Sequence, residues 1–408
     1  MANQGGLPYD TMMENAGRGT AEAIRFRAGT RNRRVVILVG PGNNGGDGLV
    51  AAHYLNEMGA RVNCYLWKRK VEQDNNFERV SKSGLPVVWA EDDPGLEVLR
   101  GLLRDADVIV DALLGVGVDR PIEGQLKAIL EESRQVVDNC GQTNELSMAV
   151  PAERRRPLIV AVDCPSGLNC DTGALDPATL PADLTVTFAH PKLGLLRFPG
   201  AEAVGEIIVA DIGIAAELAD DVPIEMATPS AIRATLPPRP RAGHKGTFGR
   251  ALIVAGSVNY VGAAVLAGAG AKRVGTGLVT MALPMPIQPA VAASLTEATY
   301  LLLPHDMGVI ASGAVKVVQE TEGYDVLLVG PGLTQEKETV SFVHTLLGLE
   351  RSDRKGHIGF VSGAAQETTN LETLPPMIFD ADALNALAAA RGWWDALPPG
   401  TILTPHPG

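Results

Sequence analysis

Short, continuous apolar runs recur between longer stretches of helical pattern, and this alternation limits the possible folds more than any other feature. The runs are rich in Val and Ile and are hydrophobic throughout, instead of at every second residue. Strands that are buried on both faces have this pattern, because helices cover a parallel sheet on both sides. The sequence therefore predicts an α/β protein with doubly wound parallel sheets.

The apolar runs form two series, and 408 residues are too many for one ordinary core, so two domains are expected. The first series comprises Arg34–Val39, Val62–Leu66, Asp107–Val110, Leu158–Val162, Leu184–Phe188 and Glu206–Ala210. The second comprises Ala251–Ala255, Leu278–Met281, Val326–Val329, Ile358–Val361, Met377–Phe379 and Thr401–Leu403.

A change of character between Asp221 and Lys245, with the segment PPRPRAG, is typical of a linker. We therefore place the two domains at residues 1–230 and 231–408. The stretch Ser133–Arg156 shows no periodicity and is predicted to be a surface excursion between a helix and the next strand.

Charge and composition exclude several classes of partner. A formal net charge of -12 and an aromatic content of 4% argue against a nucleic-acid surface. The four cysteines form no CxxC pair and the seven histidines are scattered, so a zinc site is not expected. No apolar stretch reaches membrane length, and no secretion or lipidation pattern is recognisable. A cytoplasmic protein without membrane partners is the expectation.

The segment GPGNNGGDG, residues 40–48, follows the apolar run VVILV and precedes a helical pattern. Glycine loops in this position usually bind phosphate through backbone N–H groups. This loop fits neither GxGxxG nor GxxxxGK[ST], which disfavours a nicotinamide dehydrogenase. It also carries Asp47 where an anion would sit. One structural interpretation of Asp47 is a helix N-cap, a role that is compatible with ligand binding.

Three acids, Asp47, Asp111 and Asp163, are predicted at the carboxyl ends of strands, where parallel sheets bind ligands. Each also has a purely structural interpretation. Asp111 would bond the backbone of the Gly115–Gly117 loop, and Ser166 would close the turn after Asp163. Converging acids repel a phosphate unless one is protonated or a cation intervenes.

Oxygen ligands near these acids favour a hard cation. The side chains of Asn44, Asp111 and Ser166 suit an alkali or alkaline-earth ion and not a soft transition metal. Lys192, which follows the apolar run Leu184–Phe188, is interpreted as either a phosphate contact or an ordinary surface lysine.

Five ordered motifs in the first domain resemble the NAD(P)H-hydrate epimerase (YjeF N-terminal) family. They are MMENAG (residues 12–17), GPGNNGGDGLVAA, DALLGVG, AVDCPSG and ADLTVTFAHPKLGLL. The second domain resembles the ribokinase-like ADP-dependent NAD(P)H-hydrate dehydratases. That similarity rests on HKGTFGRALIVAGSVNYVGAAVLAG, GTGLVT, VGPGLTQ, FDADALNAL and TPHPG.

The resemblance implies a fold, substrates, cofactors and site residues. It implies a Rossmann-like domain followed by a ribokinase-like domain, acting on NADHX and NADPHX, the hydrated forms of the reduced cofactors. Potassium is implied for the epimerase, ADP and Mg²⁺ for the dehydratase, and a homo-oligomer is expected. The implied substrate residues are Asn43, Asn44, Gly45, Gly46, Asp47, Gly115, Val116, Gly117, Val118, Asp119, Arg120, Pro121 and Asp163, with Gly332 and His406 in the second domain. The implied potassium ligands are Asn44, Asp111 and Ser166.

Two departures from the family pattern accompany the resemblance. The chain starts close to MMENAG, whereas the family usually has a further helical segment before it. It ends at TPHPG, whereas the family continues into a GTGD segment that holds ADP phosphates and the dehydratase base. The sequence is therefore interpreted as a C-terminally incomplete chain whose dehydratase half lacks ADP-dependent turnover.

Epimerisation inverts the carbon that bears the added hydroxyl group on the reduced ring. Asp163 is the predicted acid/base, assisting hydroxyl departure or reversible ring opening. Two other classes stay open: a non-catalytic scaffold with this N-terminal fold, and a ribokinase-like small-molecule kinase. A scaffold need not keep Asn44, Asp163 and Ser166 together, and GPGLTQ with TPHPG resembles the dehydratase branch more than a sugar kinase.

Overall fold

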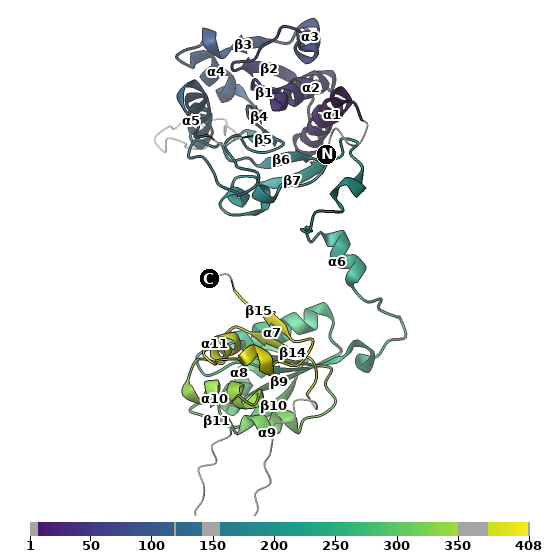
Figure 1. The fold of residues 1–408 in the computed structure, drawn as a ribbon, viewed down its shortest axis with the longest axis vertical. Coiled ribbons are helices and arrows are strands. Elements are labelled where there is room, and N and C mark those ends of the chain that lie inside the picture. Colours follow the sequence, from purple (N-terminus) through teal and green to yellow (C-terminus); the bar gives the residue numbers. More distant parts are fainter. Residues whose placement is uncertain (1–6, 118–119, 141–155, 350–373, 407–408) are drawn as a thin grey trace, which may run out of the picture. The chain divides into compact units, whose positions relative to one another are not determined.

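The computed structural model describes residues 7–117, 120–140, 156–349 and 374–406. Its contacts divide the chain into two units, Met1–Met226 and Ala227–Gly408. Each unit contains a parallel sheet with helices packed on both faces (Figure 1). The predicted α/β class is therefore confirmed. Within the described ranges, no helix combines the length and apolar character needed to cross a membrane.

The first unit contains a seven-stranded sheet in the order β3-β2-β1-β4-β5-β6-β7, and all neighbouring pairs are parallel. Its strands are β1 (Arg34–Val39), β2 (Arg61–Leu66), β3 (Val87–Trp89), β4 (Val108–Ala112), β5 (Leu158–Val162), β6 (Leu184–Phe188) and β7 (Glu206–Ala210). Its α-helices are α1 (Tyr9–Ala28), α2 (Asn43–Glu57), α3 (Asn75–Lys82), α4 (Glu97–Asp105) and α5 (Gly124–Asp138).

Alternate residues of strand β1 face two separate cores, which explains its continuous hydrophobicity. Val35, Ile37 and Val39 belong to a buried cluster that includes residues of α1, α2 and α3. Val36 and Leu38 belong to a second cluster with residues of α4 and α5. Because side chains point to opposite faces with a period of two, a strand covered on both sides needs an apolar residue at every position.

The second unit contains a six-stranded parallel sheet in the order β10-β9-β8-β13-β14-β15 and the antiparallel pair β11 and β12. Its strands are β8 (Arg250–Val254), β9 (Leu278–Pro284), β10 (Thr299–Leu303), β11 (His305–Asp306), β12 (Val309–Ile310), β13 (Val326–Val329), β14 (Met377–Asp380) and β15 (Ile402–Thr404). Its α-helices are α6 (Pro229–Thr235), α7 (Val261–Val274), α8 (Gln288–Ser294), α9 (Ala314–Gln319), α10 (Lys337–Leu346) and α11 (Asp382–Ala388).

Both sheets reverse their direction of winding at one point. In the first sheet the chain runs outward from β1 to β3 and resumes on the other side with β4. In the second it runs outward from β8 to β10 and resumes with β13. Loops diverge at such a reversal and leave a crevice at the carboxyl ends of the strands, where ligands bind in open α/β sheets. Each unit therefore has one expected site, at β1/β4 and at β8/β13.

Most strands lie where the apolar runs predict them, with three differences. Strands β3 and β10 and the two-residue strands β11 and β12 were not predicted; β3 and β10 have short apolar runs and include partly buried or exposed positions. The predicted strand Ile358–Val361 lies outside the described residues. Asp111 belongs to β4 instead of following it. The predicted excursion Ser133–Arg156 is wrong at its start, because helix α5 continues to Asp138.

Candidate active site

A buried hydrogen-bond network joins the ends of β4 and β5. The Ser166 hydroxyl donates to Asp111 Oδ1 at 2.6 Å, and the Ser166 N–H donates to Asp111 Oδ2 at 2.8 Å. The Leu114 N–H donates to the Ser166 hydroxyl at 2.9 Å. Burial raises the pKa of Asp111, and the hydrogen bonds from Ser166 and Leu113 oppose part of that rise. The structural roles suggested by sequence are therefore wrong in detail: Asp111 does not serve the Gly115–Gly117 loop, and Ser166 binds Asp111.

Asn44 approaches this network from helix α2. Its Nδ2 donates to the Leu114 carbonyl at 2.7 Å, which fixes the orientation of the amide. Asn44 is 7% exposed, and its Oδ1 is buried without a hydrogen-bond donor among the described residues. A buried amide oxygen without a partner is costly. The arrangement brings the three predicted cation ligands, Asn44, Asp111 and Ser166, together around Leu114.

Asp163 directly follows β5, and its backbone has the left-handed conformation, with φ of +64°. For a residue other than glycine this conformation is uncommon and costs of order 1 kcal/mol. The last two residues of β6 and Lys192 beyond it hold the Asp163 carboxylate. Its Oδ1 accepts hydrogen bonds from the Thr187 hydroxyl at 3.1 Å and the Phe188 N–H at 3.3 Å, and it forms an ion pair with Lys192. Lys192 is thus not an ordinary surface lysine, because it is the partner of Asp163, and its contact with a phosphate stays a prediction.

Helix α2 begins at Asn43, inside the glycine segment, with Gly42 as its N-cap. The prediction of Asp47 as a helix N-cap is therefore wrong: Asp47 lies in the second turn. Glycines are needed here because the helix packs very closely. A Cβ atom added at Gly45 would lie 2.1 Å from the Gly40 carbonyl oxygen, and one at Gly48 would lie 2.5 Å from the Ala112 Cβ.

Arg69, in the connection between β2 and α3, holds the glycine segment and was not predicted. Its Nη1 donates to the carbonyl oxygens of Gly40 at 2.9 Å and Gly42 at 3.0 Å. Its Nε and Nη2 both lie 2.7 Å from Asp74 Oδ2. Asp74 in turn caps α3 by accepting from two backbone N–H groups. A basic residue just after the strand beside β1 is the only sequence signal for this role.

The MMENAG segment lies in α1 and anchors that helix to its surroundings. The Met13 sulfur would lie 2.7 Å from a Cβ atom at Gly46, so it packs directly against the glycine segment. Glu14 accepts from Arg79 at 2.8 Å and from the Tyr54 hydroxyl at 2.5 Å. These contacts give the motif a structural role beside the site.

The second predicted wall is only partly described. Gly115 lies against Asn44, since a Cβ atom there would be 3.3 Å from the Asn44 Cβ. Val116, Gly117, Arg120 and Pro121 are exposed, as is Asn43 at the start of α2. Val118 and Asp119 lie outside the described residues.

In the second unit, the reversal point is lined mainly by backbone. Gly332 is buried with φ of +67°, and a Cβ atom there would lie 2.6 Å from the Ala263 Cβ. The Ser257 hydroxyl, just after β8, is fully buried without a partner among the described residues. His406 is exposed beyond β15, on the same sheet edge but two strands away from Gly332.

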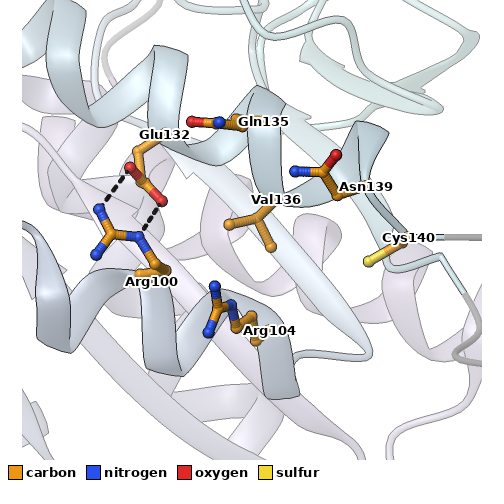
Figure 2. A pocket seen from close by; sticks show the side chains of 7 residues that line it. All are labelled: Arg100, Arg104, Glu132, Gln135, Val136, Asn139 and Cys140. Atoms are coloured by element: carbon orange, nitrogen blue, oxygen red, sulfur yellow. Dashed lines mark hydrogen bonds and ion pairs between the residues drawn. The ribbon is translucent and has the colours of Figure 1, made fainter. Parts of the chain in front are cut away.

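A cavity of about 250 Å³ lies elsewhere, between α4 and α5 (Figure 2). It is lined by Arg100, Arg104, Glu132, Gln135, Val136, Asn139 and Cys140, with Arg100 and Glu132 joined by a two-pronged ion pair (Figure 2). None of the predicted site residues lines it. The candidate active site is therefore the strand-end cluster at β1, β4, β5 and β6.

Known proteins combine the same two kinds of domain. Residues 9–194 match the YjeF-related protein N-terminus family, and residues 251–408 match the NAD(P)H-hydrate dehydratase family. A curated relative in Thermofilum pendens, the bifunctional NAD(P)H-hydrate repair enzyme Nnr, is 34% identical over 413 residues, covering 100% of this chain and 70% of the relative. Its counterpart in Moorella thermoacetica is 35% identical over 412 residues, covering 98% of this chain and 70% of that relative. The chain belongs to the family of bifunctional NAD(P)H-hydrate repair enzymes.

Among solved structures, the chain is similar to an ADP/ATP-dependent NAD(P)H-hydrate dehydratase from Bacillus subtilis, crystallised with ATP and Mg²⁺. The two are 30% identical, the match covers 46% of this chain and 54% of that one, and the TM-score is 0.32.

Proposed function

We propose that the first unit epimerises the hydrated nicotinamide cofactors NADHX and NADPHX, with Asp163 as an acid/base. The observation that carries the proposal is the strand-end cluster in which Asp163 is held by Thr187, Phe188 and Lys192. All three donors reach Oδ1, so within the described residues Oδ2 receives no hydrogen bond. A carboxylate fixed through one oxygen and open at the other is suited to exchange a proton with a bound substrate.

The substrate would lie across the reversal point between β1 and β4. Residues Asn43–Asp47 would form one wall and Gly115–Pro121 the other. The close packing of the glycines lets the backbone approach the ligand, and the ring would be presented to Asp163. Positioning of this kind accounts for a large part of the catalytic effect in many enzymes.

Asn44, Asp111 and Ser166 fit a potassium ion. The unpartnered Asn44 Oδ1 and the buried Asp111 carboxylate are hard oxygen donors. A positive charge beside Asp111 would also oppose the effect of burial on that carboxyl group. The bound ion would supply positive charge near the diphosphate of the substrate.

In a chain that carries the family's GTGD segment, the second unit would bind the (S)-epimer and support its ADP-dependent dehydration to NAD(P)H, as its family match suggests. Gly332 and His406 are the proposed substrate contacts, with ADP and Mg²⁺ as cofactors. A cytoplasmic location and a homo-oligomeric state stay predictions of the sequence, to be tested by fractionation and light scattering.

The test of the proposed function is the conversion of purified (R)-NADHX by the full chain, followed by chromatography of the two epimers. Asn accepts left-handed backbone better than most residues, so Asp163→Asn removes the acid with little strain. We expect the wild type to epimerise and the variant to be about 10²–10⁴-fold slower. Full activity in Asp163→Asn would exclude the proposed role of this residue, and an inactive wild type would exclude the function.

A further inference from the structure

Asp47 differs from the other acids of the site because, in the part of the chain that the structure describes, no side chain pairs with it. It is half-buried in the second turn of α2, and within the described residues its carboxylate makes neither a hydrogen bond nor an ion pair. The charged and titratable groups that face it are Asp163 at the end of β5, Lys192 beyond β6, Arg69 from the β2–α3 connection and Tyr9 of α1. An acid left unpaired beside an ion-paired acid needs an explanation.

The surroundings favour the neutral form of Asp47. Burial raises its pKa well above the ordinary value, and the negative charge of Asp163 raises it further, while Arg69 and Lys192 lower it only in part. Asp163, in contrast, has an ammonium group against its carboxylate. Two carboxyl groups of one site whose environments differ in this way commonly divide the roles of acid and base.

Close packing also fixes the position of Asp47. Gly46 lies against the Met13 sulfur and Gly48 against Ala112, so the helical turn between them cannot shift. On the other side, Gly17 of α1 lies against the backbone carbonyl of Asp47 itself, at 2.7 Å from an added Cβ. The backbone that carries the carboxyl group is thus closely packed, and a catalytic group benefits from such positioning.

The hydroxyl-departure route of epimerisation calls for two proton-transfer groups. On this route, oxygen leaves from one face of the ring and returns on the other. An enzyme that converts either epimer needs an acid on the face of departure and a base on the face of return. A single carboxyl group would serve one face only.

We propose that Asp47 is the second catalytic residue of epimerisation, acting on the ring face opposite Asp163. The inference rests on the proposed function. In one direction Asp47 donates its proton to the substrate hydroxyl, the C–O bond breaks, and the lone pair of the adjacent ring nitrogen forms a C=N bond as water leaves. A second water adds to the same carbon from the other face, the C=N electron pair returns to nitrogen, and Asp163 takes the water proton.

In the other direction the two carboxyl groups exchange roles. Each inversion therefore replaces the substrate hydroxyl by one solvent oxygen and moves one proton from one carboxyl group to the other. The resting proton arrangement is restored through solvent, with no other reactant consumed.

Epimerisation in ¹⁸O-labelled water tests the proposal with the full chain and each pure epimer of NADHX. The wild type should incorporate one ¹⁸O per inversion. We expect the Asp47→Asn variant to invert the substrate at least about 10²-fold more slowly than the wild type. In the epimer whose hydroxyl faces Asp163, this variant should still exchange the hydroxyl oxygen for ¹⁸O without inverting the carbon. The Asp163→Asn variant should exchange the hydroxyl oxygen for ¹⁸O only in the other epimer, whose hydroxyl faces Asp47. Glu131→Gln, an exposed change on α5, is the matched control and should behave as wild type.

Several results would overturn the inference while leaving the proposed function intact. These are inversion by Asp47→Asn within threefold of the wild-type rate, exchange in the same epimer for both variants, or wild-type inversion without solvent oxygen. Failure of the wild type to epimerise would instead remove the proposed function. A pH profile gives a second measure that needs only folded wild type. Its kcat/KM should fall as pH rises through the pKa of Asp47, and a profile without this alkaline limb contradicts the role.

Discussion

The two units share a winding scheme but line its reversal point differently. In the first unit, the crevice between β1 and β4 is surrounded by side chains that carry charge or hydrogen bonds, with Asn44, Asp111 and Ser166 at the base and the Asp163–Lys192 pair beside them. In the second unit, the equivalent crevice between β8 and β13 is bordered by glycine backbone at Gly256, Gly330 and Gly332, all with positive φ.

This difference suggests two ways of using one topology. Under the proposed function, the first unit itself holds the groups that exchange protons, so the chain supplies the chemistry. In the second unit, the carboxylate of the nearby Asp382 accepts a hydrogen bond from the Thr334 backbone N–H at 2.8 Å. A crevice bordered by glycine backbone lets bound molecules approach the main chain closely. This agrees with a dehydration that depends on ADP as a bound co-reactant.

The largest expected loss of stability comes from adding a side chain to a glycine at the reversal point of either unit. A Cβ atom at Gly40 would lie 1.7 Å from the Leu113 carbonyl oxygen, and one at Gly330 would lie 1.8 Å from that of Asp380. Neither oxygen can move without breaking its strand end. We expect Gly40→Ala and Gly330→Ala each to lower the free energy of unfolding by more than about 4 kcal/mol.

Hydrogen exchange resolved by peptide measures both changes in one chain. Gly40→Ala should accelerate exchange in β1 and β4, and Gly330→Ala in β13 and β14, with the other unit unaffected. Gly101→Ala is the control, because an added Cβ there meets nothing within 4 Å. If both variants loosened both units equally, the units would not be independent and the comparison would fail.

A smaller effect is expected from Arg69, which affects only the first unit. Lysine cannot reproduce the planar fork that reaches Gly40, Gly42 and Asp74 together. We expect Arg69→Lys to lower kcat/KM for epimerisation about 10–100-fold through misplacement of the glycine segment. If Arg69→Ala folds, it should also move the alkaline limb of the pH profile upward, because Arg69 lowers the pKa of Asp47.

The control for this prediction is Arg100→Lys on α4, since Arg100 forms a similar two-pronged pair with Glu132 away from the site. Steady-state kinetics of both variants with (R)-NADHX make the measurement. Equal losses in the two would point to a general loss of stability and not to a role in the site.

The smallest expected effect is stabilisation of the first unit by potassium. An ion that binds only the folded state at ten times its Kd adds about 1.4 kcal/mol to the free energy of unfolding. The melting temperature of the first unit should therefore be higher in KCl than in N-methylglucamine chloride of equal ionic strength. Asn44→Ala should remove the difference, and Asn169→Ala, in an exposed turn, should keep it. An equal increment in Asn44→Ala would exclude Asn44 as a ligand.

Sequence pattern predicted the bounds of several strands, including β7, whose residues are partly buried or exposed, and missed the strands β3 and β10. Strands β1, β5 and β6 have the predicted bounds, because their continuous apolar runs reflect cores on both faces. Strand β3 has only intermediate burial and β10 includes exposed positions, and the short apolar runs of both were missed.

The cluster of acids at strand ends was also foreseen, because the carboxyl ends of parallel strands meet at one edge. The partners of those acids were not. Arg69 and Lys192 are distant in sequence from the groups they bind, and only the order of strands places them there. The start of α2 was misjudged because five glycines among nine residues suggest a loop, whereas close packing against Met13 and Ala112 makes a glycine-rich helix start favourable.

The left-handed backbone at Asp163 has a consequence for how this domain can change over generations. Asn and Gly are the residues that tolerate such a conformation best, besides Asp itself. A lineage that no longer needs the acid can therefore drift to Asn by one base change and keep its fold. Most other replacements would be removed by selection for stability. Among sequences with this domain, the residue at this position would then separate working enzymes from descendants that survive as binding proteins.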